Sequence, residues 1–529
     1  MTTKIKNSEY HNITKNALTV AFFTSISRIT GLARDILIFH IFGVGLITDA
    51  FFLAFTIPNT LRRFVAEGAL TVAFIPVYIN VIIKHGVKSA IELLKTTLGF
   101  ILIFLIILII SGIFGAKYIV YAFASGFACE PNKINMTILL TQIIFPYIAF
   151  ISLVALSMSV LNAHKHFIAP AASPILLNIS IILSTIFLIQ LFTEPISAVA
   201  IGVVIGGAAQ LLFQLPFLAK FNLLVFPKLN FRLSPFKKLL KLLIPSIFGV
   251  AIYQLNLIVL RQLGSYLPNG QISYYYNADR LMQCALGIFA FSIATAALPQ
   301  MSIKSIKDDK NALLNTWIFT TKLTNFITLP ASLGLIAISI PLVSILYLHG
   351  KFNLYDVKMT AYTTMSFAPG LITTAINRIT VQAFFALEDM KTPVYVGTIT
   401  LFINIIIGLA LLPYEIIGLG LTLSISSLIQ MLILITLLTM KLNYKNYRKL
   451  LFSFIEQFTL AFWAALSAYL ITTFGTWELG ANIKNLLILS LSLIVSSLIY
   501  FILALKLKIY EAQILCNIFI LKNKKRYYN

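Results

Sequence analysis

Charged residues and cysteines are both scarce in this chain of 529 residues. Only 11% of its residues are charged and 59% are hydrophobic, whereas about a quarter of the residues in a soluble domain are charged. This composition predicts a polytopic membrane protein and excludes an ordinary soluble domain. The three cysteines, Cys129, Cys284 and Cys516, have no metal-ligand spacing and give no disulfide framework.

Motifs that carry enzymatic chemistry are also missing. The sequence contains no HExxH zinc motif, no P-loop, no GxSxG elbow and no DxD pair of carboxylates. Asp308 and Asp309 lie among lysines and are interpreted as a solvated charge run. His164 and His166 flank a loop lysine, and this pair is equally compatible with a phosphate contact and with a solvated loop. The sequence therefore predicts no enzyme, no cofactor and no metal site. The driving force is then an ion gradient or the membrane potential, which supplies about 2.3 kcal/mol per charge per 100 mV.

Long apolar runs occupy most of the chain. Crossing the hydrocarbon core takes about 20 residues of helix, so the runs predict an all-α protein with about fourteen transmembrane helices. The first run is interpreted as a retained helix, because no small-residue cleavage site precedes it. The fourteen runs are residues 16–42, 47–80, 91–115, 134–162, 166–191, 196–218, 239–266, 272–300, 312–345, 355–386, 393–411, 415–440, 450–474 and 483–507.

The lysines and arginines between these runs predict the orientation. If the N-terminus lies inside, most loop cations are cytoplasmic, and the outer loops hold only Lys117, Lys133, Lys351, Lys358 and Lys484. Cytoplasmic loops of membrane proteins carry an excess of Lys and Arg, so both termini are expected in the cytoplasm. The net charge of +23 is then divided between loops and membrane interior, and it forms no basic face for nucleic acid.

A weak internal repeat divides the chain. FPYIAFISLVALSMSVLNAHKHFIAP (145–170) parallels FAPGLITTAINRITVQAFFALEDMKTP (367–393), and each ends in a short basic loop and a proline. Repeats six spans apart share their topology, so their symmetry axis runs along the membrane normal. The predicted domains are an N-lobe (1–220), a C-lobe (221–444), two further helices (445–510) and a basic cytoplasmic tail (511–529).

Several arginines lie inside or at the edge of the apolar runs. Each cation at mid-bilayer depth costs about 2.5–3.5 kcal/mol on insertion scales, so packing alone does not explain a whole set of them. We interpret the set as the lining of a water-filled, positively charged cavity for an anionic cargo. Its members are Arg28, Arg34, Arg62, Arg63, Arg261, Arg280 and Arg378.

The first run contains Arg28, Arg34 and Asp35. On a helix Arg28 and Asp35 lie on nearly the same side, and Arg34 lies about a third of a turn away. Asp35 can therefore partly neutralise an arginine without cancelling the positive field. The alternative is an arginine that extends to the membrane interface, which suits Arg34 better than the mid-run Arg28.

The second run contains Asp49, Arg62, Arg63 and Glu67. Arg63 and Glu67 have i,i+4 spacing, which predicts an ion pair that lowers the cost of burial. Arg62 has no such neighbour, so an anion suits it. Asp49 is expected near the outer mouth of the cavity, and the alternative is an exposed loop carboxylate.

The second half of the chain adds fewer candidates. Asp279 and Arg280 are adjacent and point about 100° apart on a helix, which makes Arg280 available to a ligand. Arg378, deep in the tenth run, is a further candidate. Arg261, at the end of the seventh run, is expected to extend to the interface.

Several motifs occur together in the first eighty residues: SRxxGxxRD, TDAFF, PNxLRR, EGA and AFxP. With YYNADRLM (275–282) and ALEDMKTP (386–393), they resemble the MurJ (MviN) family of lipid II flippases. This family is part of the multidrug/oligosaccharidyl-lipid/polysaccharide exporter superfamily. The resemblance implies two six-helix lobes around a V-shaped cavity, and two further helices that form a groove for a polyprenyl tail.

The resemblance also implies roles for particular residues. Arg28, Arg34, Arg62 and Arg280 correspond to essential cavity arginines, and Asp35 and Asp49 to essential or near-essential carboxylates. Arg63 and Glu67 match neighbouring motif positions. The sequence departs from the family at Gln283, where some relatives carry Glu. It also reads Val259-Leu260-Arg261 where sodium-binding relatives have an acidic residue, so the coupling ion stays open.

The expected function is transport of undecaprenyl-diphosphate-linked disaccharide-pentapeptide across the bacterial inner membrane by a monomer among membrane lipids. Three alternatives stay open: an exporter of another polyprenyl-linked glycan, a multidrug exporter of the same superfamily, and a polyprenyl-phosphate transferase. A multidrug exporter would need an acidic, aromatic-lined cavity, and a transferase would need a catalytic base or metal carboxylates. A non-transporting scaffold would not explain the buried arginines.

Overall fold

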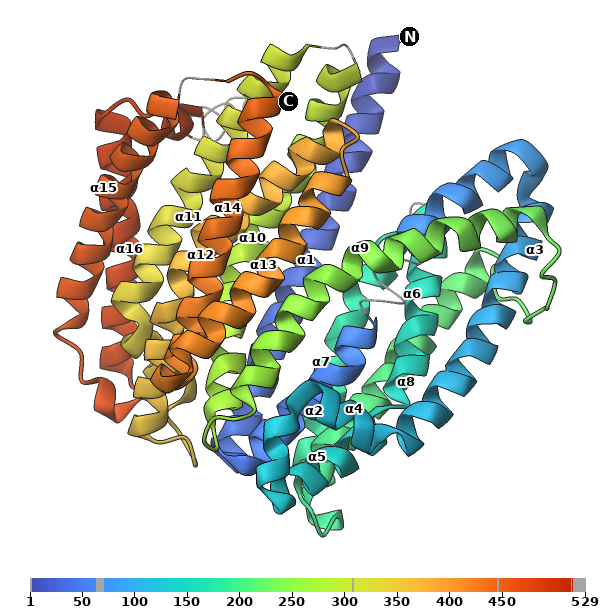
Figure 1. Ribbon diagram of the computed structural model, residues 1–529, viewed down its shortest axis with the longest axis horizontal. Coiled ribbons are helices and arrows are strands. Elements are labelled where there is room, and N and C mark those ends of the chain that lie inside the picture. Colours follow the sequence, from blue (N-terminus) through green and yellow to red (C-terminus); the bar gives the residue numbers. More distant parts are fainter. Residues whose placement is uncertain are drawn as a thin grey trace. The chain divides into compact units, whose positions relative to one another are not determined.

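All secondary structure that the computed structural model describes is helical (Figure 1). The described residues are 2–62, 71–164, 166–306, 309–444, 447–514 and 516. The chain divides into two compact units, unit 1 (residues 1–270) and unit 2 (residues 271–529). The predicted all-α class is confirmed. The four predicted domains and their boundaries stay a prediction.

Unit 1 is built on helix α7, which packs against both α1 and α8. Helix α6 packs against α3 and α8, α2 packs against α5, and α9 packs against α3 and α4. The elements of unit 1 are α1 (Thr2–Phe42), α2 (Leu46–Arg62), α3 (Thr71–Phe114), α4 (Ala116–Ala124), the 3-10 helix η2 (Ser125–Cys129), α5 (Pro131–Ile144), α6 (Tyr147–Ala163), α7 (Ile168–Phe187), the 3-10 helix η3 (Ile189–Leu191), α8 (Ile196–Lys220) and α9 (Ser234–Gly264).

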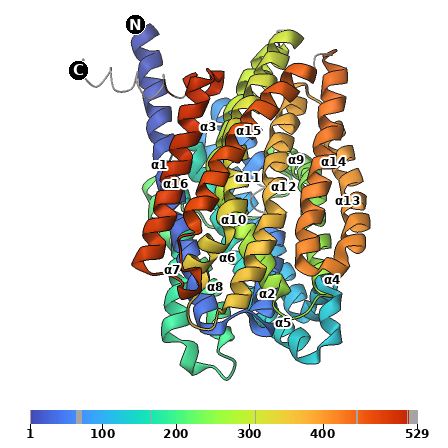
Figure 2. The same cartoon turned by 90° about the vertical axis from the view of Figure 1, so that its left-hand side faces the viewer.

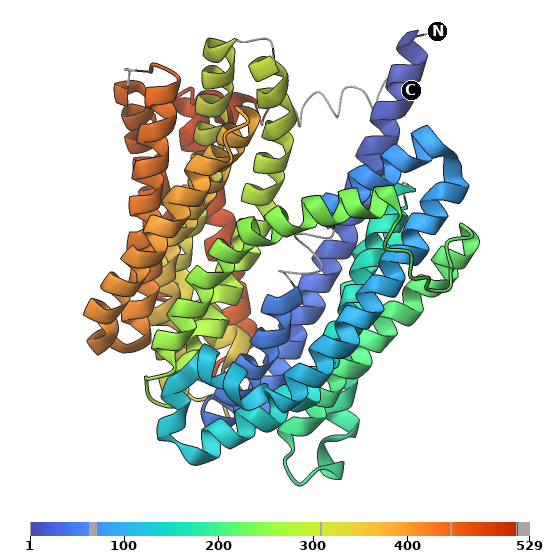
Figure 3. The ribbon, with the colours of Figure 1, turned by 45° about the vertical axis from the view of Figure 1, so that its right-hand side comes forward.

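Two of these helical stretches change direction. Helix α3 bends at Gly86, whose φ of 79° and ψ of 171° are not helical, and the bend is visible in the blue ribbon of Figure 3. Helices α5 and α6 form one bent pair with an angle of 42° between them. Within the predicted run 47–80, residues 47–62 belong to α2 and residues 71–80 to α3, and residues 63–70 lie outside the described residues.

Unit 2 is built on helix α12, which packs against α10, α11 and α14. Helix α15 packs against α11 and α16, and Figure 2 shows the red ribbons of α15 and α16 side by side. The elements of unit 2 are α10 (Gln271–Ile306), α11 (Lys310–Tyr347), α12 (Leu354–Ala386), α13 (Lys391–Leu411), the 3-10 helix η4 (Leu412–Tyr414), α14 (Glu415–Lys441), α15 (Tyr447–Thr472), the 3-10 helix η5 (Trp477–Leu479) and α16 (Ile483–Lys506).

Three helices of unit 2, α11, α12 and α16, begin at polar capping residues. Asn353 precedes α12, and its side chain accepts from the backbone N–H groups of Tyr355 and Asp356. Its own backbone N–H donates to Oδ2 of Asp356, which completes a capping box. Asp309 caps α11, and Asn482 caps α16. Such caps satisfy backbone donors that have no partner within the helix.

The length and composition of the helices confirm a multi-pass membrane protein. Seven helical segments among the described residues are long and apolar enough to cross a membrane, and the bent pair α5–α6 adds an eighth if it is counted as one span. The predicted total of fourteen spans stays a prediction.

Candidate functional site

Arg34 and Asp35 form a buried ion pair in the interior of unit 1. Arg34 is 5% exposed and Asp35 is 0% exposed. The guanidinium donates from Nε and Nη2 to Oδ1 of Asp35 over 2.9 Å and 2.5 Å. Its Cζ lies 5.6 Å from the ring centroid of Phe55 on α2, which adds a cation–π contact. Arg34 is therefore an interior residue, and the interface-seeking alternative is wrong for it.

Asn178 on α7 holds this part of α1 in place. Its Oδ1 accepts from Nη1 of Arg34 over 3.2 Å, and its Nδ2 donates to the carbonyl of Ser27 over 2.9 Å and to Oγ1 of Thr30 over 3.1 Å. One carboxamide thus contacts three residues of the SRxxGxxRD motif. The sequence interpretation missed Asn178, although an asparagine inside an apolar run is itself a signal.

The other cationic candidates of unit 1 lie nearer the surface. Arg28 on α1 and Arg62, the last residue of α2, are both half-buried. Arg63 and Glu67 lie outside the described residues, so their ion pair stays a prediction. Helix α1 therefore offers one deeply buried arginine, Arg34, and one half-buried arginine, Arg28.

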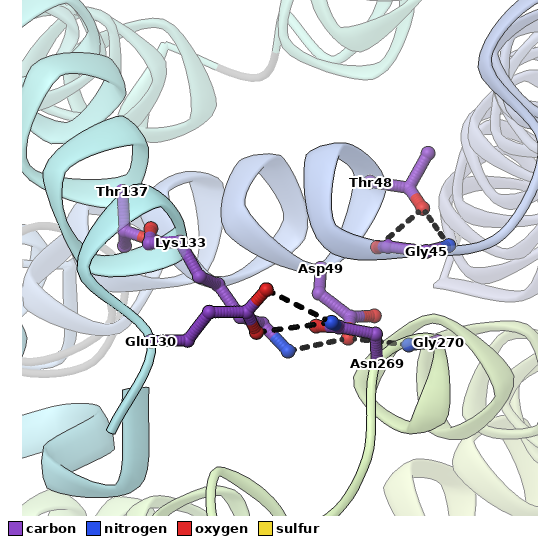
Figure 4. A network of polar contacts seen from close by, with 8 residues as sticks. All are labelled: Gly45, Thr48, Asp49, Glu130, Lys133, Thr137, Asn269 and Gly270. Atoms are coloured by element: carbon purple, nitrogen blue, oxygen red, sulfur yellow. Dashed lines mark hydrogen bonds and ion pairs between the residues drawn. The ribbon is translucent and has the colours of Figure 1, made fainter. Parts of the chain in front are cut away.

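Asp49 forms the second buried ion pair of unit 1, with Lys133 (Figure 4). Asp49 is 0% exposed and Lys133 is 3% exposed, and Nζ of Lys133 donates to Oδ2 of Asp49 over 2.9 Å. The ammonium lies 4.1 Å from the ring centroid of Phe127. The alternative of an exposed carboxylate at Asp49 is therefore wrong. Lys133, which was counted among the loop lysines, is a buried residue in the first turn of α5.

The helix end beneath Asp49 favours its negative charge. Asp49 lies in the first turn of α2, where backbone N–H groups and the helix dipole stabilise an acid. The turn is tightened by Thr48, whose hydroxyl accepts from the N–H of Gly45 over 3.1 Å. The negative charge of Asp49 is thus stabilised by its own helix, whereas its partner Lys133 lies 84 residues further along the chain.

The two histidines of the α6–α7 loop pack against aromatic rings. His164 Nε2 lies 3.3 Å from the hydroxyl of Tyr78, and the rings of His166 and Phe217 lie 5.0 Å apart. Burial lowers the pKa of His164, and burial followed by the nearby Lys220 ammonium lowers the pKa of His166. Both imidazoles are therefore biased toward the neutral form, and the choice between a phosphate contact and a solvated loop stays open.

The candidates of unit 2 lie on α10 and α12. Asp279, Arg280 and Arg378 are all half-buried. The Asp279 carboxylate accepts from Nε2 of Gln283 over 3.3 Å. The sequence interpretation missed a buried carboxylate in this unit, Asp356, which accepts from the hydroxyl of Tyr274 over 2.7 Å.

No group of three His, Cys, Asp or Glu side chains that could hold a metal ion occurs among the described residues. The polar centres of each unit are instead built from arginines, lysines, single carboxylates and carboxamides. Such groups bind anions or one another.

A family model described as "Lipid II flippase MurJ" matches residues 38–488 of the chain. The chain belongs to the MurJ family. It is 36% identical over 504 residues to the probable lipid II flippase MurJ of Buchnera aphidicola subsp. Schizaphis graminum, which covers 93% of this chain and 96% of that protein. The expected family is thereby confirmed.

Solved structures extend the MurJ comparison to the fold. A structure of "Lipid II flippase MurJ, inward closed conformation" has a TM-score of 0.75 and 28% identity, and the match covers 92% of this chain and 99% of that one. An inward-facing multidrug resistance MATE family transporter of the MOP superfamily has a TM-score of 0.64 at 12% identity, over 80% of this chain and 94% of that one. The second likeness concerns the fold alone, and it is the superfamily fold that was predicted.

Proposed function

We propose that this protein is a transporter that moves lipid II, an undecaprenyl-diphosphate-linked disaccharide-pentapeptide, from the inner to the outer leaflet of the bacterial cytoplasmic membrane. Membership of the MurJ family and the names of its relatives support this substrate. The observation that carries the proposal is the buried Arg34, which Asp35 and Asn178 hold in a fixed orientation inside a membrane protein.

The charge of the α1 segment suits a diphosphate. Residues 27–35 contain two arginines and one aspartate, which leaves the segment with one net positive charge. Guanidinium groups donate in a planar fork that matches phosphate oxygens, which a lysine ammonium does not do. Arg62 is a further candidate arginine in the same unit, and Arg280 and Arg378 are the substrate-binding candidates of unit 2.

The transport cycle is alternating access by a monomer with both termini in the cytoplasm. The distribution of loop lysines supports this orientation, and a solved relative named for its inward closed conformation supports a cycle with several states. Asp35, Asp49 and Asp279 act as charge partners while the site opens and closes. The membrane potential or an ion gradient drives the cycle.

Complementation tests the arginines directly. Arg34→Ala and Arg280→Ala should each abolish growth support in cells depleted of their own flippase, while the amount of protein in the membrane stays unchanged. Arg34→Lys keeps the charge but loses the fork, so we expect partial function. Arg232→Ala, at an exposed loop arginine between α8 and α9, is the matched control and should complement fully.

The substrate is tested by leaflet distribution. Depletion of the protein should cause lipid II to accumulate on the cytoplasmic leaflet, measured with a probe that reaches only the outer leaflet. An unchanged distribution, or full complementation by both alanine variants, would contradict the proposal. Accumulation of a different polyprenyl-linked glycan would assign the chain to that substrate instead.

A further inference from the structure

The connection from α8 to α9 is a strap of irregular backbone, residues 221–233, that follows directly on Lys220, the last residue of α8. Helix α8 is one of the segments that are long and apolar enough to cross a membrane. The strap therefore lies at the membrane surface, whichever leaflet this end of α8 reaches. The whole strap belongs to unit 1.

Backbone contacts with α3 fix the middle of the strap. The N–H of Lys228 donates to the carbonyl of Lys95 over 3.1 Å. A Cβ on Gly99 would lie 2.6 Å from the carbonyl oxygen of Lys228, so the two backbones approach closely at this point. Nζ of Lys228 also donates to Oε2 of Glu92 over 3.0 Å. These contacts hold the strap against α3.

Apolar side chains of the strap are exposed on both sides of this attachment. Phe226 is 90% exposed, and Leu224, Leu229 and Phe231 are 59%, 53% and 50% exposed. Pro227 fixes the φ angle next to Phe226, and the attachment to α3 follows directly after it. The Phe226 ring is thus held away from the protein core. A group of exposed apolar side chains within one short segment marks an interaction surface.

The charge around the strap is positive. No Asp or Glu occurs between Glu194 and Asp279 in the sequence. Glu92, which contacts the strap from α3, is shared by Lys95 and Lys228, so this group keeps one net positive charge. Six exposed cations line the strap and the first turns of α9: Lys220, Lys228, Arg232, Lys237, Lys238 and Lys241.

Exposed aromatic and cationic side chains together suit the boundary between lipid and water. Apolar side chains enter the region where the acyl chains begin, and cations stay beside the phosphates. The cytoplasmic leaflet of a membrane is anionic and attracts basic segments. The cations would also attract a soluble acidic partner, but a segment that follows directly on a membrane-spanning helix meets the lipid headgroups first.

We propose that the strap and the first turns of α9 form a docking surface for anionic phospholipids, with Phe226 inserted at the depth of the headgroups and the six cations bound to lipid phosphates. The surface anchors α3 in the leaflet, because the strap is fixed to that helix. The inference rests on the proposed function only for its orientation, which makes this leaflet the cytoplasmic one.

Depth measurements at Phe226 test the insertion. A spin label is attached to Phe226→Cys, with Cys129, Cys284 and Cys516 changed to serine, and the full chain is placed in lipid nanodiscs. The discs contain phosphatidylcholine alone or an equal mixture with phosphatidylglycerol. Depth is measured from collisions of the label with oxygen and with a water-soluble nickel complex. The anionic discs should shift the label from water into the headgroup region, and about 1 M salt should reverse the shift because it screens the charges.

Phe187→Cys provides the matched control. Phe187 is the last residue of α7, lies in the same unit and is 71% exposed. No Lys or Arg occurs between Lys165 and Lys220 in the sequence, so a label at this position should have the same depth in both kinds of disc. An equal shift at both positions would be a general effect of the lipid and would overturn the proposal.

Charge removal tests the cations. The triple variant Lys237→Gln, Lys238→Gln and Lys241→Gln should lose the shift of the Phe226 label in anionic discs. The control variant changes three exposed lysines of unit 2 to glutamine, and it should keep the shift: Lys351, Lys358 and Lys484. Equal behaviour of the two triple variants would contradict the role of the cations. If the first variant fails to reach the membrane, the salt dependence of the parent still decides the proposal.

These measurements involve neither lipid II nor its transport. A normal shift of the Phe226 label in a protein that does not move lipid II would overturn the proposed substrate alone. A label that stays in water in anionic discs, in a protein that moves lipid II, would overturn the docking surface alone. A label shielded from oxygen and nickel alike in both kinds of disc would show that protein covers Phe226, and would also overturn the docking surface.

Discussion

Buried polar groups have different kinds of partner in the two units. In the described part of unit 1, two ion pairs are deeply buried: Arg34 with Asp35, and Lys133 with Asp49. In unit 2, α12 and α14 are joined by neutral contacts. Thr373 and Ser427 share a hydrogen bond of 2.5 Å, and Asn377 donates to the carbonyl of Ser427 over 2.9 Å.

Close backbone approach accompanies the neutral contacts of unit 2. The N–H of Gly370 donates to Oγ of Ser424 over 3.0 Å, and a Cβ on Gly420 would collide with the side chain of Ser366. Small residues allow such approach between membrane helices, where each interhelical hydrogen bond contributes about 0.6 kcal/mol. Breaking a buried ion pair by removing one partner costs about 3–5 kcal/mol. The contrast indicates that neutral hydrogen bonds are enough to hold α12 against α14. Unit 1 instead retains buried charged residues that helix packing alone does not require.

The largest predicted effect concerns the Arg34–Asp35 pair. Asp35→Ala should lower the free energy of unfolding by about 3–5 kcal/mol, because it leaves a buried guanidinium without its carboxylate. The measurement is thermal or denaturant unfolding of the purified protein in detergent. The double variant Arg34→Met with Asp35→Ala removes both charges and should regain most of the stability. A small loss of unfolding free energy in Asp35→Ala would show that water already reaches the Arg34–Asp35 ion pair.

Two asparagines sharpen the comparison, since each joins helices of one unit. Asn178→Ala removes a hydrogen bond to a charged group and should cost about 1.5–3 kcal/mol, with impaired transport because Arg34 loses its orientation. Asn377→Ala removes neutral contacts and should cost about 1 kcal/mol or less, with near-normal transport per folded molecule. The two variants are compared by unfolding and by complementation. Equal transport defects in Asn178→Ala and Asn377→Ala would mean that transport depends equally on the charged contacts of unit 1 and the neutral contacts of unit 2.

Much of the fold could be predicted from hydropathy alone. The predicted run 355–386 corresponds to α12 (Leu354–Ala386), and the run 415–440 corresponds to α14 (Glu415–Lys441). The predicted and observed bounds of these two helices agree because each apolar run ends at a polar or turn-forming segment. The bend at Gly86 was not predicted, because hydropathy reports depth in the membrane and not the direction of a helix.

The candidate site was predictable in part, for a related reason. A buried charge such as Arg34 or Asp49 stands out within an apolar run, so the sequence identifies it as costly. Its partner does not stand out, because partners are brought together by tertiary packing. Asn178 lies 144 residues from Arg34 in the sequence, and Lys133 lies 84 residues from Asp49. A rule that assigns lysines to loops by charge balance cannot detect that one of them folds inward.

The smallest predicted effect concerns an ion pair at the surface of unit 2, between Asp389 in the α12–α13 loop and Lys441 at the end of α14. Burial alone would raise the pKa of Asp389, but hydrogen bonds from Lys441 and Thr392 lower it from 3.8 to about 2. A carboxyl whose pKa is lower in the folded state stabilises the fold above pH 3.8, and this contribution is lost as the pH falls through 2. Because Lys441 is exposed, the contribution should stay below about 1 kcal/mol. The difference in unfolding temperature between the parent and Asp389→Asn should therefore shrink as the pH falls from 6 to about 2. At neutral pH, the difference between the parent and Asp35→Ala should be larger than the difference for Asp389→Asn. A constant Asp389→Asn difference across that range would show that its hydrogen bonds do not depend on the charge.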